Sequence, residues 1–123
     1  MEINAAANLT IQTSGGPAVS AAWTIEADLF DRAIVKIPKN ITSLAVPLQP
    51  AGGDKILLLL ITASKYTSDL TYKLNGDEFK LTQVQILSGP DLVKKLSATP
   101  TNVTFKNVST EDITVDVFVL RKA

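Results

Sequence analysis

The sequence predicts an all-β fold, an antiparallel β-sandwich or jelly roll of about eight or nine strands. Apolar and polar residues alternate with a period of two along most of the chain, as in strands with one buried face. Turn-forming residues recur at intervals of roughly 8–12 residues, which is typical of such folds. The chain has 123 residues, enough for one domain. We expect a single β-sandwich domain over 1–123, with residues 1–8 as a possible extended N-terminal arm.

The N-terminal part predicts two strands separated by Gly15-Gly16-Pro17. The first covers about residues 8–13 and the second residues 19–28. In the second strand the odd positions are apolar, which predicts one face in a core and one in solvent. Trp23 is in phase with these positions, so we interpret it as a core residue rather than an exposed platform.

Three further strands are expected in the middle of the chain. A short one lies around residues 34–37, and the next, over residues 44–48, contains Pro47. Proline cannot donate to a ladder, so this strand is predicted to be an edge or to carry a bulge. The run Ile56–Ile61 is apolar without alternation and follows a turn at residues 49–53. It is predicted to be a central strand that is buried on both faces.

The C-terminal half predicts two hairpins and one helical turn. Residues 70–74 and 77–81 flank Asn75-Gly76, which favours a type I′ turn. Ser88-Gly89-Pro90-Asp91 leads into a short helix near residues 90–96. Residues 102–107 and 112–121 are predicted to pair as the final hairpin, closed by residues 108–111.

Charge and hydropathy restrict the choice of partners. Lysine plus arginine equals aspartate plus glutamate at 12 each, which argues against nucleic acid and against an anionic membrane. The start, Met1-Glu2-Ile3-Asn4, lacks the basic and apolar segments of a signal peptide. The run Ile56–Ile61 is far shorter than the roughly 20 residues that a membrane span needs. We therefore expect no signal peptide and, from these features, a cytoplasmic location.

Catalytic chemistry has little support in the composition. The chain contains no histidine and no cysteine, which removes the usual general base, the thiol nucleophile and most zinc sites. Acidic pairs at Asp28/Asp31, Asp77-Glu78 and Glu111-Asp112 leave a two-carboxylate hydrolase or a calcium site as minor alternatives. Each pair lies where turn-forming or solvated acids are common. We predict no enzymatic activity, no catalytic residues, no cofactor and no metal.

Carbohydrate binding is the stronger alternative. It requires exposed aromatic side chains, and only Tyr66 and Phe30, beside expected loops, are credible ones. Asn-x-Ser/Thr triplets begin at Asn8, Asn40, Asn102 and Asn107. Without a signal peptide, we interpret them as strand and turn residues rather than glycan acceptors.

The start MEINAAANLTIQTSGG and the end NVTFKNVSTEDITVDVFVLRKA, in a neutral β chain without cysteine or histidine, resemble accessory virion proteins of tailed bacteriophages. The resemblance covers architecture and composition, without a shared motif. It implies a capsid decoration (cement) protein, a homotrimer that binds the major capsid protein and copies of itself. The alternative is a carbohydrate- or receptor-binding module of a phage tail or adhesin. The expected contact residues are Ile3, Leu9, Ile11, Phe30 and Tyr66.

Overall fold

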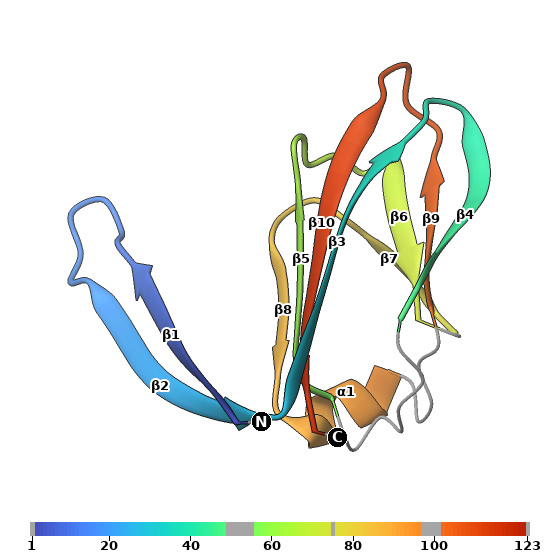
Figure 1. Cartoon of the computed structure of the whole chain (residues 1–123). Coiled ribbons are helices and arrows are strands. Elements are labelled where there is room, and N and C mark those ends of the chain that lie inside the picture. The colour runs from blue at the N-terminus through green and yellow to red at the C-terminus, as the bar shows by residue number, and fades with distance from the viewer. Residues whose placement is uncertain (1, 49–55, 75, 97–101, 123) are drawn as a thin grey trace.

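The computed structural model describes residues 2–48, 56–74, 76–96 and 102–122. These residues form ten strands and one short helix, which confirms the all-β class (Figure 1). No helix among them is long and apolar enough to cross a membrane. The elements are β1 (Ile3–Ile11), β2 (Val19–Ala27), β3 (Leu29–Ile37), β4 (Ile41–Pro47), β5 (Ile56–Ala63), β6 (Leu70–Lys73), β7 (Glu78–Lys80), β8 (Gln85–Ser88), α1 (Pro90–Leu96), β9 (Asn102–Asn107) and β10 (Ile113–Arg121).

The body is a sandwich of two antiparallel four-stranded sheets. Sheet I has the order β3-β10-β5-β8, and sheet II has the order β4-β9-β6-β7. Alternate residues of both sheets point inward and form the main core. The largest fully buried side chains of this core include Phe105, Ile37, Leu59, Ile61 and Ile113.

Two predictions about individual strands are confirmed. β5 lies inside sheet I between β10 and β8, and Leu58 and Leu59, which point to opposite faces, are both buried. β4, which ends at Pro47, is an edge strand of sheet II, and its pairing with β9 shifts register between Ile41 and Leu44. The missing donor of proline therefore costs no ladder bond inside a sheet.

The predicted final hairpin is wrong, because β9 and β10 belong to different sheets. β9 pairs with β4 and β6, whereas β10 pairs with β3 and β5. The chain crosses between the sheets after Asn107, whose buried side chain donates to the carbonyls of Ile37 (3.1 Å) and Glu111 (2.9 Å). Its Oδ1 accepts from the Ser109 N–H (3.0 Å). Because the bonds to Ile37 and Glu111 both come from Nδ2, the Asn-x-Ser triplet that begins at Asn107 has a structural role in the fold.

Strand number and boundaries also differ from the prediction. The prediction missed β8, because its two apolar residues, Ile86 and Leu87, are adjacent and show no alternation. β3 begins at Leu29 instead of near residue 34, and β1 covers residues 3–11 instead of 8–13. Helix α1 is confirmed over Pro90–Leu96, and its Val93 is buried.

The other predicted hairpin is confirmed as a pair of strands. β6 and β7 pair from Thr71↔Lys80 to Lys73↔Glu78. The Tyr72 and Phe79 rings face each other across the pair, with centroids 5.6 Å apart. Residue 75 of the predicted Asn75-Gly76 turn lies outside the described residues. The turn predicted at residues 49–53 lies wholly outside them.

Strands β1 and β2 form a separate two-stranded sheet that stands away from the body, here called the arm (Figure 1). Residues 1–8 were expected as a possible extended N-terminal arm, and residues 3–8 belong to the first strand of this hairpin. Gly15 allows the turn, with a φ of 74°. The expectation that β2 packs in a core is wrong for most of its length, because only Ile25 and Ala27 are buried.

Candidate functional site

The arm has one apolar face and one polar face. Its register pairs residues directly across the two strands, so each pair shares one face of the sheet. The polar face carries Asn4, Asn8, Thr10, Ser20, Thr24 and Glu26, with Ala6 and Ala22 between them. The other face is apolar at every position, and its pairs are Ile3↔Ala27, Ala5↔Ile25, Ala7↔Trp23, Leu9↔Ala21 and Ile11↔Val19.

Sheet I has a second apolar surface on the side away from the core. The registers of β3, β10, β5 and β8 place Phe30, Ile34, Phe118, Leu120, Leu58, Leu60 and Ile86 on this outer face. Phe30 and Ile34 are 57% and 62% exposed. The Phe30 and Phe118 rings lie together, with centroids 6.2 Å apart. An outer face of this kind normally carries polar residues in a sandwich.

Two ion pairs involve this outer face, and each is neutral as a unit. Lys36 lies 3.6 Å from Asp112 at one end of β3, and Arg32 pairs with Asp116 between Phe30 and Ile34. Arg32 binds the Asp116 carboxylate through two nitrogens, with Nη2 2.7 Å and Nε 3.1 Å from its oxygens. This forked contact raises the pKa of Arg32, first through the hydrogen bond and then through the charge of Asp116. A partner that covered this face would therefore meet no unpaired charge there.

The base of the arm is packed against the outer face. Ile25 and Ala27 of the arm form a buried cluster with Leu58 and Leu120 of sheet I. The Asp28 N–H, between β2 and β3, donates to the Arg121 carbonyl at 3.0 Å. These contacts hold the arm at an angle to the body. They also show that the two apolar surfaces pack well against each other.

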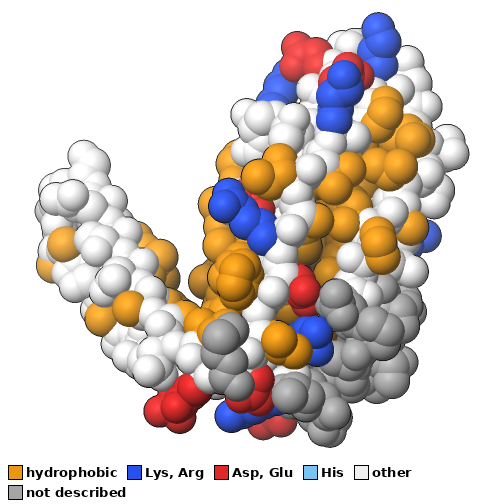
Figure 2. All heavy atoms as spheres, in the orientation of Figure 1, with side chains coloured by type: hydrophobic (Ala, Val, Ile, Leu, Met, Phe, Trp, Pro, Cys, Tyr) orange, Lys and Arg blue, Asp and Glu red, His pale blue; other side chains and the backbone are white. Residues whose placement is uncertain are grey.

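Beyond its base, the arm diverges from the body and leaves an open cleft (Figure 2). Its volume is about 430 Å³. The arm wall comprises Ala5, Ala6, Ala7, Asn8, Leu9, Trp23 and Ile25, and the body wall comprises Leu58, Leu60, Ile86, Phe118 and Leu120. Past the cleft, toward the tip, Ile11 and Val19 are 54% and 64% exposed. Hydrophobic side chains thus line both walls and continue onto the tip.

Trp23 lies deep in this cleft. It is half-buried against the arm-base cluster instead of in the core between the sheets, where its phase had placed it. Its indole N–H is buried and has no acceptor among the described residues. Tryptophan donors in such positions usually find a partner. As the only tryptophan of the chain, it also reports on the state of the cleft.

Comparisons with protein-family models, curated proteins and solved structures yield no match for this chain. Any assignment of function therefore rests on the surfaces of the molecule itself.

The structure places the five predicted contact residues on three separate parts of the molecule. Ile3, Leu9 and Ile11 lie on the apolar face of the arm, and Phe30 lies on the outer face of sheet I. Tyr66 lies beyond the opposite end of β5, where its hydroxyl accepts from the Ala63 N–H at 3.2 Å. The two aromatics considered for sugar binding are thus at opposite ends of sheet I.

Sequence reasoning missed much of the cleft. Trp23 was assigned to a core, and Ile86 was not singled out. One signal was available in the sequence. The odd-numbered positions are apolar in both β1 and β2, so each of the two strands has an apolar face that another surface would be expected to cover.

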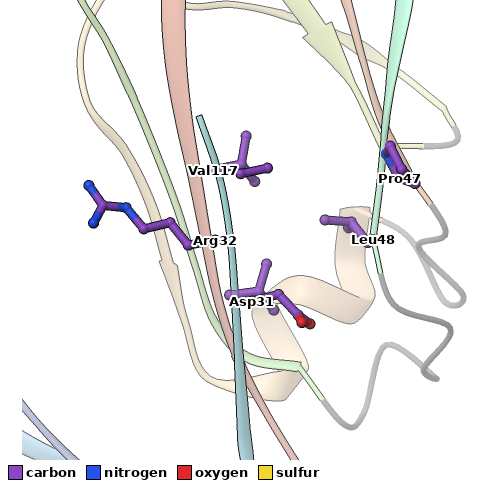
Figure 3. A pocket seen from close by; sticks show the side chains of 7 residues that line it. Asp31, Arg32, Pro47, Leu48 and Val117 are labelled. Carbon is purple, nitrogen blue, oxygen red and sulfur yellow. The ribbon is translucent and has the colours of Figure 1, made fainter. Parts of the chain in front are cut away.

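A second cavity, of about 350 Å³, lies between the edge strands β3 and β4 (Figure 3). Its lining is Asp31, Arg32, Ala33, Pro47, Leu48, Val117 and Val119. The carboxylate of Asp31 is 3.0 Å from Nε of Arg121, and the Arg32 side chain points away from Pro47 and Leu48. The described lining therefore offers one ion-paired carboxylate, without a nucleophile beside it.

The other acidic pairs considered for catalysis or calcium binding have structural partners. Glu111 lies 2.9 Å from Lys65, and Glu78 lies 3.8 Å from Lys73. Asp112 accepts from the Lys39 N–H at 2.9 Å, and this hydrogen bond is the main cause of its lowered pKa. Within the described residues, no three acidic, histidine or cysteine side chains are grouped so as to hold a metal ion.

Proposed function

We propose that this chain is a non-enzymatic structural protein of a phage virion. In this proposal it decorates or cements the capsid as a homotrimer that binds the major capsid protein at the capsid surface. The observation that carries the proposal is the arm, a hairpin whose apolar face extends beyond anything in its own chain that covers it.

The energetics of the arm support a binding role. An isolated two-stranded hairpin is at best marginally stable in water, and exposed apolar surface of this extent commonly marks an interaction site. The exposed side chains of Leu9, Ile11 and Val19 carry an unfavourable free energy of hydration. Contact with another surface would remove that free-energy cost. If these residues had no binding role, polar residues in their place would make the hairpin more favourable in water.

The two walls of the cleft also suit a mechanical role. They offer aliphatic and aromatic contact area with a self-neutralised ion pair at the margin, and a zero net charge does not repel neighbouring copies. Contacts shared among several subunits add their free energies through multivalency, without requiring one tight site. This is how a small protein raises the cost of separating shell subunits.

The test is density-gradient fractionation of a lysate from the source, with the chain followed by mass spectrometry. We expect it to migrate with intact particles at a fixed ratio to the major shell protein. Particles stripped of the chain should rebind it and then release their genome at a higher temperature than bare particles. Recovery of the chain only as free protein at the top of the gradient would refute the proposal.

A matched pair of variants extends the test to the arm. Ile11→Asp places a charge on the apolar face, whereas Thr10→Asp places the same charge one residue away on the polar face. Rebinding to stripped particles should weaken at least tenfold for the first and remain unchanged for the second. Equal behaviour of the two variants would remove the arm from the interface.

A further inference from the structure

The exposed tip of the arm must be covered by something other than its own body. The buried contacts of Ile25 and Ala27, and the bond from Asp28 to Arg121, determine the angle at which the arm leaves. The tip of the arm points away from the body (Figure 1), and Ile11 and Val19 are 54% and 64% exposed.

The same chain carries a second uncovered surface, on β3. Phe30 and Ile34 lie on the outer face of sheet I but outside the wall that the arm overhangs. They are four residues apart, about 13 Å along a strand. Arg32 lies between them on the same face, with its charge paired to Asp116. The tip region from Ala7 to Ile11 has the same length and is apolar at Ala7, Leu9 and Ile11.

We infer that the arm tip of one copy packs on the Phe30–Ile34 strip of a second copy. This inference rests on the proposed function, since it names the partner of the arm within the proposed homo-oligomer. The contact repeats what the arm base already does within one chain, where an arm strand face lies on the outer face of sheet I. Both surfaces are free of unpaired charge, because the Arg32–Asp116 pair is neutral as a unit.

The numbers of arm tips and strips also favour a second copy. Each chain has one arm tip and one strip, so a closed ring in which each copy serves the next leaves none uncovered. A single capsid subunit seated on the arm would cover the tip but leave the strip of every copy exposed. A capsid peptide in the cleft is therefore an outcome of the test rather than the inference.

The absence of cysteine from the sequence makes a direct test possible. Two single variants, Ile11→Cys and Ile34→Cys, one of them carrying a mass tag, are mixed, unfolded together, refolded and oxidised without capsid. A disulfide forms only where Cα atoms approach to roughly 4.4–6.8 Å. We expect a covalent heterodimer at least tenfold more abundant than with Thr10→Cys in place of Ile11→Cys.

The double variant Ile11→Cys/Ile34→Cys separates exchange from closure. Exchange predicts covalent oligomers on a denaturing gel. A covalent monomer of raised mobility would show that the arm closes on its own body, which overturns the inference. Disulfides only between two Ile11→Cys chains, meaning tip-to-tip contact, or no cross-linking above the Thr10→Cys control, would also overturn it.

A measurement without cross-links completes the test. Light scattering should give an oligomer for the wild type and for Thr10→Asp, and a monomer for Ile11→Asp and Ile34→Asp, with circular dichroism checking that each variant folds. Because Trp23 lines the cleft and not the proposed contact, its emission checks that the arm keeps its place in each variant. A monomeric wild type, or one that forms oligomers only after a capsid peptide is added, contradicts the inference.

The two proposals fail separately. An oligomer cross-linked through Ile11 and Ile34 that never migrates with particles would refute the virion role and leave arm exchange standing. A chain that binds particles at a fixed ratio yet shows no exchange cross-link would do the reverse.

Discussion

Replacing Asn107 by alanine should destabilise the protein more than most single substitutions would. Asn107 is the fully buried polar residue at which the chain leaves sheet II for sheet I. Its side chain joins the end of β3, through the Ile37 carbonyl, to the segment before β10, through the Glu111 carbonyl. Alanine removes these bonds and supplies no donor or acceptor in their place.

The magnitude follows from the bonds lost. The Asn107 side chain donates two hydrogen bonds and accepts two, from the Ser109 N–H at 3.0 Å and the Ser109 Oγ at 2.6 Å. A net value of about 1 kcal/mol for each gives an upper figure of about 4 kcal/mol. Water replaces part of the half-buried bonds, so we expect a loss of about 3 kcal/mol. For a chain of this size that is roughly a 12 °C fall in Tm.

The assay is urea unfolding at one protein concentration, followed both by circular dichroism and by Trp23 emission. The matched control is Asn102→Ala at the other end of β9, where the side chain accepts a hydrogen bond from Thr104 Oγ1 at 3.1 Å. It should cost under about 1 kcal/mol. A loss at Asn107 no larger than that at Asn102 would refute the idea that this amide joins the two sheets.

A second substitution, Asn107→Asp, tests the direction of the bonds. The carboxylate still accepts from Ser109 but turns an oxygen toward the carbonyls of Ile37 and Glu111, so its pKa in the folded variant rises. The resulting penalty is absent below the unfolded pKa of about 4 and grows as the pH rises through the folded pKa. The variant should therefore be less stable than Asn107→Ala at pH 7 and recover toward acid pH.

Three further predictions concern other parts of the fold. Gly15→Ala should weaken amide protection in the arm about fivefold, because alanine at its positive φ costs about 1 kcal/mol, and should leave the body unchanged. Burial raises the pKa of Tyr72, which donates to Gln85 at 3.0 Å, so wild-type stability should fall as the pH rises above about 10, whereas Tyr72→Phe should stay flat there. The Lys39 N–H lowers the pKa of Asp112, so the advantage of wild type over Asp112→Asn should be present near pH 7 and vanish as the pH falls through that lowered pKa.

Local chemistry allowed much of the fold to be predicted. Alternation located β2 and β10, the unbroken apolar run located β5, and Pro47 indicated an edge strand. These signals act over a few residues, so they can be recognised in one sequence. The sheet to which a strand belongs depends on contacts between distant residues. The turn at residues 108–111 has the composition of a hairpin, and only the burial of Asn107 beneath Ile37 shows that it joins two sheets.

The candidate site shows the same difference between local sequence signals and contacts between distant residues. The alternation in β2, from Val19 to Ala27, predicts that one face will be covered, and that much is correct at Ile25 and Ala27. It does not say which surface covers it. In the structure, the tip half of this face has the residues of a core, but Ile11 and Val19 there are exposed. The proposed partner of the arm therefore rests on this exposed core-like face, which alternation alone would have assigned to the interior.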